Sequence, residues 1–289
     1  MISIGNLQIN KLCLGDVEVT KAYLGDVQVY GSTPQPVGKY MTMTVLDGDS
    51  GTTISPKITG TLSPNLQYRI NNGDWTDFIV GTTADIKVVA GDAVQWKGMN
   101  TGGLSVDSSN YLNFAVSGNP VALSGNVMSL IDGIGDALEI PGDYCFYSLF
   151  MNSNIKTVSS DFLPATTLTY ACYRDLFHNC QNLTQAPALP ATNLNYDCYH
   201  GIFYRCTSLT TAPALPATKL ISGCYGYMFA YCNSLNYVKC LATEGITIPN
   251  ALLDWLFDVS STGTFVKPTG VTYETGVHGI PQGWTVEEI

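Results

Sequence analysis

Basic residues are scarce in this sequence and never stand next to one another. Lys and Arg total 13 of 289 residues against 23 Asp and Glu, which leaves a formal net charge of −10. Proteins that hold nucleic acid neutralise its phosphates with grouped Lys and Arg. We therefore predict that this chain has no nucleic-acid partner.

Long hydrophobic runs are also lacking. No stretch approaches the roughly 18 consecutive apolar residues that a membrane-spanning helix needs, so no membrane span is predicted. The first residues, MISIGNLQINKLCLG, have neither the basic start nor the apolar core of a secretory signal. We expect the chain to be made and folded in a cytoplasm.

Recognisable catalytic and metal-binding motifs are missing as well. His178, His200 and His278 have no nucleophile motif beside them, and neither Gly-x-Ser-x-Gly nor Cys-x-x-Cys occurs. We predict a protein that is not an enzyme and that carries no cofactor or metal. Two alternatives stay open. The paired acids of a polysaccharide depolymerase need not be close in sequence, and the alternating carboxylates Asp47 and Asp49 are compatible with calcium, although a plain turn is the preferred interpretation.

Strand- and turn-forming residues dominate what is present. Hydrophobic residues make up 45% of the chain, which holds 28 Gly and 17 Tyr. This composition supports buried cores and favours strands and turns over long helices. The predicted fold class is mainly β with α/β repeats, in three parts: an N-terminal β-meander, a β-sandwich module and a C-terminal repeat region.

Residues 1–30 repeat with a period of ten. In each unit Gly-Asn or Gly-Asp stands between alternating apolar residues, which is a hairpin signal. So short a sheet is marginal alone, and two interpretations follow: a meander packed on its neighbouring domain, or a docking segment that pairs with another subunit. We favour docking because residues 31–39 have the composition of a linker. The predicted docking residues are Leu14, Val17, Val19, Leu24, Val27 and Val29.

Residues 40–122 read as one all-β module. Apolar residues alternate with polar ones at 41–45 and 66–70, and further short strands are expected at 86–89, 93–96 and 111–114. Gly-rich turn signals separate them. Several short strands at this spacing predict a β-sandwich.

The strongest pattern is a 26-residue repeat within residues 123–245. Leu-Pro-Ala-Thr begins at 163, 189 and 215, and Cys, Tyr, Phe and Cys return at fixed places in every unit. A fixed period of this size is typical of a solenoid, whose units bury their faces against one another. Cys172, Leu176 and Cys180 are spaced i, i+4, i+8, which predicts a helix with an apolar stripe. A helix and a short strand per unit is the plan of a leucine-rich-repeat solenoid, which residues 246–289 are predicted to cap.

The cysteines of the repeat are predicted to be packing residues. Residues eight apart on a helix are separated by roughly 12 Å along its axis, whereas a disulfide needs Cα atoms within about 7 Å. Small buried thiols agree with folding in a reducing compartment. The predicted structural core of the repeat consists of Cys172, Phe177, Cys180, Cys198, Phe203, Cys206, Cys224, Phe229 and Cys232.

The segment Met-Phe-Ala-Tyr-Cys-Asn-Ser-Leu at 228–235 resembles BspA-like leucine-rich repeats. The likeness covers roughly residues 140–240, with a longer period than that family's usual one, and the ending at 262–286 is similar to a recurrent ending of those proteins. The family is associated with surface proteins of gut Bacteroidetes, of parasites, and of phages that infect such bacteria. The Leu-Gly-Asp-Val motifs at 14–17 and 24–27 are similar to the N-termini of structural proteins of Bacteroidetes phages, including crAss-like phages. The resemblance therefore implies a virion protein.

Positions that differ between the repeat units define a candidate binding surface. They lie between the framework residues, on the predicted helix face opposite the Cys stripe, and hold residue types that anchor interfaces. Drift of a solvated face is the alternative explanation. The candidate binding residues are Arg174, His178, His200, Tyr204, Arg205, Tyr227 and Tyr231. Gln185, Thr211 and Tyr237 form a second candidate row on the strand side.

Two functions are compatible with these features. The first is a non-enzymatic bacteriophage structural protein, a fibre or decoration attached to the head or tail. Its N-terminal segment docks on other virion proteins, and its repeats bind a protein or a host cell-surface glycan. Such a protein is expected in the virion, folded in the bacterial host cytoplasm and assembled as a homo-oligomer. The second is a bacterial cell-surface adhesin with leucine-rich repeats.

Overall fold

The computed structural model describes residues 39–289 and, of the residues before them, those in six short strands. It comprises two compact units, Met1–Gly38 and Lys39–Ile289. The prediction of a mainly β protein is confirmed, since the one helix among the described residues is the single turn α1 (Ser129–Asp132). No described helix has the length and apolar character needed to cross a membrane.

The first unit contains three antiparallel hairpins. They pair β1 (Ile2–Ile4) with β2 (Leu7–Ile9), β3 (Cys13–Leu14) with β4 (Val17–Glu18), and β5 (Ala22–Leu24) with β6 (Val27–Tyr30). The Gly-Asn and Gly-Asp pairs of the predicted turns lie outside the described residues. Of the predicted docking residues, Leu14 pairs with Val17, Leu24 pairs with Val27 and Val29 lies in β6. Val19 and, apart from Lys39, the predicted linker at 31–39 lie outside the described residues.

The second unit begins with two sheets. The larger has the order β10 (Thr76–Asp77), β9 (Gln67–Ile70), β12 (Ala93–Lys97), β7 (Met41–Val45), β14 (Val121–Ser124), β15 (Ile155–Val158), and the smaller has the order β11 (Ile86–Val88), β8 (Thr52–Thr59), β13 (Tyr111–Gly118). Alternate residues of β7 and β13 are buried, as a strand with one face on a core requires. The rings of Trp96 in β12 and Phe114 in β13 lie 4.8 Å apart, so side chains of the two sheets meet.

The two sheets continue directly into the repeat region. β15 pairs in parallel with β14. Phe114 N–H donates to Leu149 O (2.7 Å), and Asn154 N–H donates to Val116 O (3.0 Å). The buried apolar side chains form one cluster that runs from Met41 to Trp284. The β module and the repeats therefore share a core.

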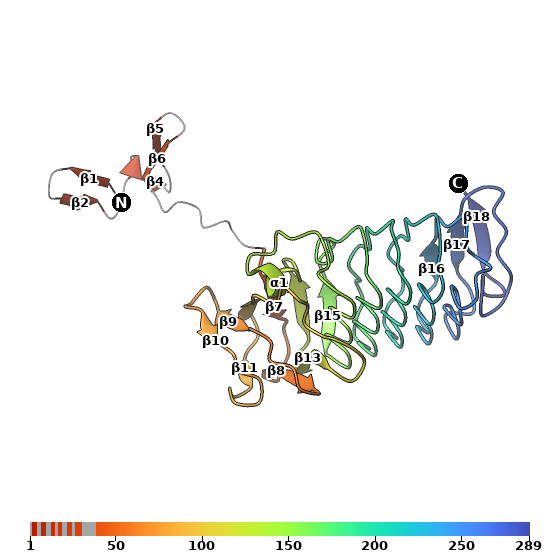
Figure 1. Ribbon diagram of the computed structural model, residues 1–289, viewed down its shortest axis with the longest axis horizontal. Helices are drawn as coiled ribbons and strands as arrows, with labels where there is room; N and C mark the ends of the chain where they lie inside the picture. The colour runs from red at the N-terminus through yellow and green to blue at the C-terminus, as the bar shows by residue number, and fades with distance from the viewer. Residues whose placement is uncertain are drawn as a thin grey trace. The chain divides into compact units, whose positions relative to one another are not determined.

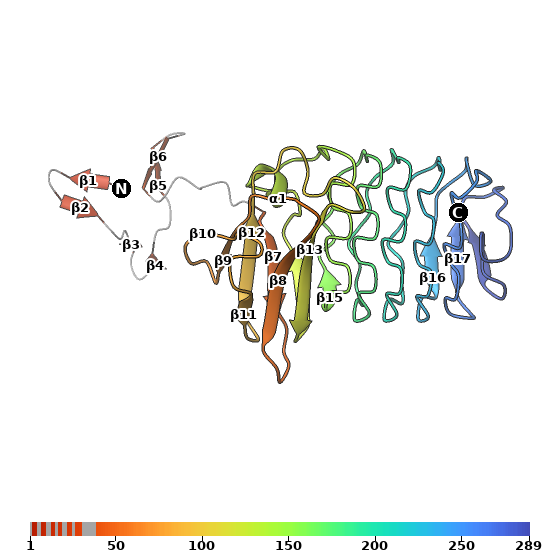
Figure 2. The ribbon, with the colours of Figure 1, turned by 60° about the horizontal axis from the view of Figure 1, so that its bottom comes forward.

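Successive repeat units form coils that stack side by side between β15 and β16 (Tyr237–Lys239) (Figures 1 and 2). On one side of the stack the coils are joined mainly by single parallel bridges, such as Thr157 to Gln185 and Thr211 to Tyr237. The stack ends in a parallel sheet of β16, β17 (Thr264–Lys267) and β18 (Thr285–Glu288).

The predicted helix in each unit is wrong. The stretch at 171–179 is a chain of overlapping turns, in which Arg174 N–H donates to Ala171 O and His178 N–H donates to Asp175 O, three residues back. The amides between these residues donate to carbonyl groups of the next coil; Tyr173 N–H, for example, donates to Cys198 O (3.0 Å). We call this stretch the turn ribbon, and it recurs at 144–152, 197–205, 223–231 and 250–258. Half of its amide donors thus depend on the neighbouring coil.

Left-handed residues recur every fourth position in the turn ribbon, which explains why it cannot be a helix. In the second coil these residues are Ala171, Asp175 and Asn179, with φ of 50°, 55° and 59°. A repeat of four residues keeps the same side chains inward at every step, whereas a helix of 3.6 residues per turn drifts. The i, i+4, i+8 spacing that suggested a helical stripe is therefore the period of the ribbon.

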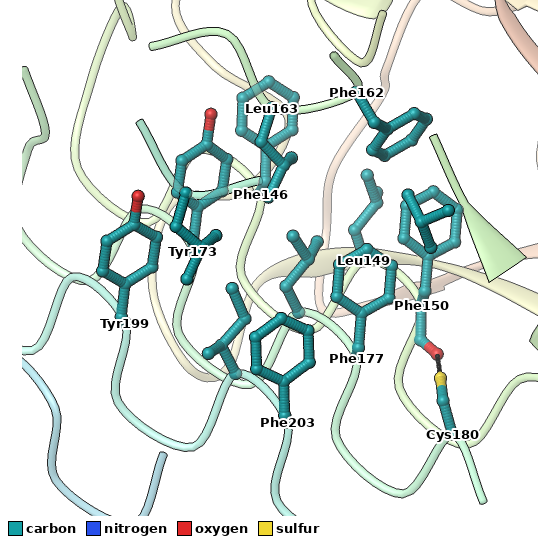
Figure 3. Close-up of a cluster of buried hydrophobic side chains, with 14 of the residues drawn as sticks. Phe146, Leu149, Phe150, Phe162, Leu163, Tyr173, Phe177, Cys180, Tyr199 and Phe203 are labelled. Carbon is teal, nitrogen blue, oxygen red and sulfur yellow. Dashed lines mark hydrogen bonds between the residues drawn. The ribbon is translucent and has the colours of Figure 1, made fainter. Parts of the chain in front are cut away.

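Two aromatic ladders fill the stack. Phe150, Phe177, Phe203 and Phe229 stack with ring centroids 5.6, 5.8 and 5.6 Å apart. Phe146, Tyr173, Tyr199 and Tyr225 form the second ladder, with separations of 5.6, 5.9 and 6.3 Å. Figure 3 shows its first three rings, Phe146, Tyr173 and Tyr199, beside Phe150, Phe177 and Phe203 of the first ladder. Because each ring contacts an equivalent ring in the next coil, the repeated side chains fix the register of the stack.

Candidate functional site

The seven candidate binding residues all lie on the outward side of the turn ribbon, and they fall into two groups. His178, Tyr204, Arg205 and Tyr231 lie in contact along one line that crosses successive coils. Arg174, His200 and Tyr227 belong to a second cluster, held together by charge and burial. The first group is the more open of the two and is the better candidate for binding.

The first group forms an aromatic strip, which we define as His178, Tyr204, Arg205, Tyr231 and Phe257. The ring centroids of His178 and Tyr204 lie 4.6 Å apart, those of Tyr204 and Tyr231 5.3 Å, and those of Tyr231 and Phe257 5.2 Å. Phe257 is 38% exposed, and the other three rings are half-buried. Four rings from four coils therefore make a continuous, partly exposed surface.

Arg205 lies at the centre of the aromatic strip. Its guanidinium carbon is 5.5 Å from the Tyr204 ring centroid and 5.2 Å from that of Tyr231, both within cation–π range. Its side chain is exposed, and none of the ion pairs within residues 39–289 involves it. The two tyrosine rings hold the Arg205 guanidinium in place, and its N–H donors remain open to a ligand.

Arg205 and Tyr231 also occupy left-handed backbone positions, with φ of 59° and 63°. Bulky residues are uncommon there, and such a conformation costs roughly 1–2 kcal/mol per residue. Asn and Asp tolerate it best, and at the same place in other coils the chain has Asn152, Asn179 and Asp258. The ribbon also places Tyr144, Ala171 and Tyr227 in this conformation, so the strain is a property of its backbone and is not confined to the strip.

The second group centres on an ion pair between two coils. Arg174 Nη1 donates to Asp197 Oδ2 at 2.9 Å, and Arg174 Nε lies 3.6 Å from Asp175 Oδ2. Asp175 Oδ1 in turn lies 3.3 Å from His178 Nδ1, which connects this cluster to the aromatic strip. The Arg174 guanidinium is therefore occupied by carboxylates of the protein itself.

His200 is half-buried, and the centroid of its imidazole lies 5.3 Å from that of the Tyr227 ring. Burial lowers the pKa of His200, and the positive charge of Arg174 lowers it further. Its Nδ1 is buried without a hydrogen-bond partner among the described residues. His200 thus packs as a neutral ring between coils, and it is a poorer binding residue than its sequence position suggested.

The second candidate row lies on the strand side. Gln185 and Thr211 are exposed and Tyr237 is half-buried, and the row is spread over the parallel bridges that join the coils. None of the aromatic pairs and ion pairs of residues 39–289 joins its members. Thr211 and Tyr237 are bridge partners on neighbouring coils, but the row lacks the ring contacts and the exposed cation of the aromatic strip.

The predicted core residues are all buried. Their side chains are Cys172, Phe177, Cys180, Cys198, Phe203, Cys206, Cys224, Phe229 and Cys232. The eight cysteines from Cys145 to Cys240 are free. The thiols of Cys180, Cys206 and Cys232 each donate to the carbonyl of a phenylalanine in the preceding coil, at 3.0–3.2 Å. Burial raises the pKa of Cys172 and Cys180 to about 12, so these thiols stay protonated and are not nucleophiles.

The loop with alternating carboxylates is closed by an asparagine. Asn119 Oδ1 accepts from Ser50 N–H (3.1 Å), and its Nδ2 donates to Gly48 O (3.2 Å). The asparagine side chain therefore fills the interior of the loop that contains Asp47 and Asp49. Within residues 39–289, no three His, Cys, Asp or Glu side chains gather as a metal would require.

Sequence reasoning missed Phe257, Asp175 and Asp197. Phe257 was assigned to the cap because the last ribbon is displaced: the left-handed residues Tyr231 and Asp258 are 27 residues apart instead of 26. Allowing that one insertion would have aligned Phe257 with His178 and Tyr204. Asp175 is one of the positions that vary between units, where it aligns with Gly201 and Tyr227, but it was not among the candidate binding residues; Asp197, which aligns with Gly223, was not considered.

A further aromatic cluster lies on the β module around Trp75, which was not among the predicted binding residues. The Arg69 guanidinium carbon lies 4.7 Å from the Trp75 ring centroid, and Lys97 Nζ lies 4.4 Å from it. Two cations of the protein already cover this ring, so it offers less surface to a ligand than the strip does.

The chemistry available at the aromatic strip is binding. Ring faces stack on apolar or C–H-rich surfaces, and the Arg205 donors pair with an acceptor. Comparison with protein-family models, with curated proteins and with solved structures gave no match to this chain. Function is therefore inferred from the residues and their geometry.

Proposed function

We propose that the chain is a non-enzymatic structural protein of a bacteriophage particle whose repeat region binds a partner through the aromatic strip. The aromatic strip carries this proposal, because rigid, partly exposed rings with a central arginine are typical of the anchors of binding interfaces. On this proposal the protein is a head- or tail-attached fibre or decoration, made and folded in the bacterial host cytoplasm.

The finer architecture belongs to the same proposal. We assign the coils to a variant of the BspA-like leucine-rich-repeat solenoid, in which a turn ribbon replaces the helix of each unit. The two sheets before it act as a β-sandwich that holds the first coil. Stacked coils with buried aromatic ladders support this assignment, as do free, buried thiols, which suit folding in a reducing compartment.

The N-terminal hairpins are assigned to docking. They form a compact unit of their own, and two-stranded hairpins are marginal without further pairing. Pairing with other virion proteins, or with copies of this chain in a homo-oligomer, would supply the missing partners.

Particle labelling tests the virion assignment. Antibody against the full chain, with gold detection, should mark purified phage particles, and particles of a mutant phage lacking the gene are the control. Gold on uninfected bacterial cells, with none on particles, would replace this proposal with the bacterial adhesin. A chain without residues 1–30 should fold and yet be absent from particles.

Binding to host cells tests the role of the strip. The purified full chain should bind host cells, and Tyr204→Ala and Tyr231→Ala should each weaken binding about tenfold or more, as truncation of an interface anchor does. Lys219→Ala, an exposed residue away from the strip, is the matched control. Equal binding by all four proteins would remove the aromatic strip from the function.

A further inference from the structure

The last turn ribbon, at 250–258, has backbone amide donors without acceptors. In the ribbon before it, alternate amides donate to the next coil, as Tyr225 N–H does to Ala251 O (3.1 Å). One amide of the last ribbon has a substitute partner, because Asp254 N–H donates to His278 Nδ1 at 3.0 Å. The equivalent amides that have no acceptor among the described residues are those of Leu252, Leu256 and Asp258. This edge of the stack therefore offers hydrogen bonds to a ligand that carries acceptors.

A groove of about 540 Å³ lies at the first of these amides. The side chains that line it include Ile248, Leu252, Leu253, Thr272, Glu274 and His278. The first three are apolar and belong to the last ribbon or to the residues just before it, and the other three belong to a later segment of the chain. A peptide laid along the ribbon would thus have apolar contacts on one side and polar contacts on the other.

The ribbons of a second copy of this chain do not supply the acceptors. The carbonyls of the last ribbon already accept from the coil before it, as Trp255 O does from Phe229 N–H (2.9 Å). Two last ribbons would therefore oppose donor to donor. The first ribbon is covered by the β module, where Leu104 N–H donates to Cys145 O (3.2 Å). An extended segment of another protein does supply acceptors, because its carbonyls project at alternate residues from one edge.

The charge around the groove favours a basic segment. From residue 241 onwards the acidic residues are Glu244, Asp254, Asp258, Glu274, Glu287 and Glu288, and the one Lys or Arg, Lys267, is paired with Glu288. Glu274 in the groove is exposed, and none of the ion pairs within residues 39–289 involves it. An unpaired carboxylate beside a groove attracts Lys or Arg of a partner and repels an acidic one.

We propose that the groove at the C-terminal end of the stack binds an extended, basic segment of a partner protein. Backbone carbonyls of the segment accept from Leu252 N–H, its Lys or Arg side chains pair with Glu274, and its apolar side chains pack on Ile248 and Leu253. This is strand addition, on a turn ribbon in place of a sheet edge. The inference goes beyond the proposed function, because it concerns a different surface from the aromatic strip and a different ligand.

Amide hydrogen exchange in the full chain, followed by nuclear magnetic resonance, tests the donors. Without ligand, Leu252 N–H should exchange about tenfold or more faster than Tyr225 N–H, its paired equivalent in the coil before. Addition of the peptide acetyl-(Lys-Val)4-amide should slow exchange at Leu252 and leave Tyr225 unchanged. Backbone carbonyls do not depend on sequence, so this peptide represents any basic strand. Equal protection of the two amides in the free protein, or no slowing at Leu252 by the peptide, overturns the inference.

Calorimetry separates recognition of the peptide backbone from attraction between charges. The basic peptide should bind about tenfold or more tightly than spermine, which has the same four positive charges and no carbonyl groups. It should also bind more tightly than acetyl-(Glu-Val)4-amide, which has the same backbone and the opposite charge. Equal affinity for the peptide and spermine, or preference for the acidic peptide, contradicts the proposal.

Variants of the groove locate the site. Glu274→Lys should weaken binding of the basic peptide about tenfold or more, whereas Glu139→Lys makes the same change at an exposed residue before the first coil and should have little effect. Thr272→Trp fills the groove and should abolish binding. Because Thr272 and Glu274 are exposed, the melting temperatures should match that of the unmodified chain.

An equal loss of affinity in Glu274→Lys and Glu139→Lys would show general attraction to an acidic protein and would refute the site. Full binding by Thr272→Trp would refute it as well. Tyr204→Ala, in the aromatic strip, should leave affinity for the peptide unchanged. Failure of this inference is therefore distinguishable from failure of the proposed function, which binding to host cells tests.

Discussion

Three tyrosine hydroxyls lie inside the stack of coils. The hydroxyls of Tyr173, Tyr199 and Tyr225 are buried and have no hydrogen-bond partner among the described residues. Burial raises the pKa of each phenol well above its usual value, so all three stay protonated. The equivalent residue of the first coil is Phe146, which stacks on Tyr173 without a hydroxyl. Stacking in this ladder therefore needs only the aromatic ring, and each tyrosine hydroxyl is a buried polar group without a hydrogen-bond partner among the described residues.

Tyr199→Phe is expected to raise the free energy of unfolding by about 1 kcal/mol, because it removes a buried hydroxyl that lacks a partner. Chemical denaturation of the full chain measures the change. The reverse substitution in the neighbouring ladder, Phe203→Tyr, should lower stability by adding such a group to a packed site. Destabilisation by Tyr199→Phe would instead reveal a partner such as a buried water.

His200 should make the stability of the protein depend on pH. Its pKa is lowered by burial in the folded state, so the unfolded state binds the proton more readily. The stabilising contribution is therefore complete above the unfolded pKa of about 6.5 and is lost as the pH falls below it.

His200→Gln tests this dependence. The melting temperature of the unmodified chain should fall more steeply between pH 7.5 and pH 5, both about one unit or more from the unfolded pKa, than that of the variant. Identical slopes for the two proteins would show that His200 has the same pKa in the folded and the unfolded state.

At the scale of the element, the turn ribbon was the main error of the sequence-based prediction. The repeat period and the inward residues were predictable, because Cys172, Phe177 and Cys180 recur with their equivalents. The backbone was not, since apolar residues at i, i+4 and i+8 fit both a helix and a four-residue turn repeat. Asp175 and Asn179 contained the missing signal: Asx residues four apart, at places where the backbone is left-handed.

Gly201→Ala distinguishes the ribbon from a helix. In an exposed helix this change would stabilise the protein by up to about 1 kcal/mol. In the ribbon Gly201 has a φ of 62°, and a Cβ there would lie 2.3 Å from Asp175 Oδ1. We expect a loss of about 1–2 kcal/mol, measured by chemical denaturation.

Ala171→Gly is the reciprocal variant. Ala171 has a φ of 50°, so glycine relieves strain and should leave stability equal or higher. Higher stability of Gly201→Ala together with lower stability of Ala171→Gly would show that this stretch is a helix and not a turn ribbon.

At the scale of the whole molecule, the sequence predicts a β module and a repeat region as separate domains. In the structure the two share one core. The strands at 41–45, 93–97 and 111–118 were largely predictable from alternating burial. β8 was missed because Pro56 interrupts it, although it pairs with β13 along its whole length. The contacts of β13 with the first coil, such as Phe114 with Phe150 at 6.0 Å, are long-range and have no local signature.

Phe114→Ala is therefore expected to destabilise both parts together, by about 3–5 kcal/mol for a large buried ring. In a background with Trp75→Phe and Trp96→Phe, fluorescence reports Trp255 and Trp284 in the coils, whereas near-ultraviolet circular dichroism reports aromatic side chains of both parts; the midpoints of the two melts should shift by the same amount. Removal of residues 1–38, a separate unit, should leave the transition where it was. A shift confined to one probe would mean that the β module and the coils unfold separately.

The alternating amide donors of the turn ribbon give the stack a mechanical character. Tyr173 N–H and its equivalents bond forward to the next coil, while their neighbours bond within their own. A pull on the C-terminus would therefore detach the last coil before the one beneath it loses its own turns. Each 26-residue coil would release roughly 90 Å of extended chain, so that a tether made of this domain would yield in steps and absorb work without breaking.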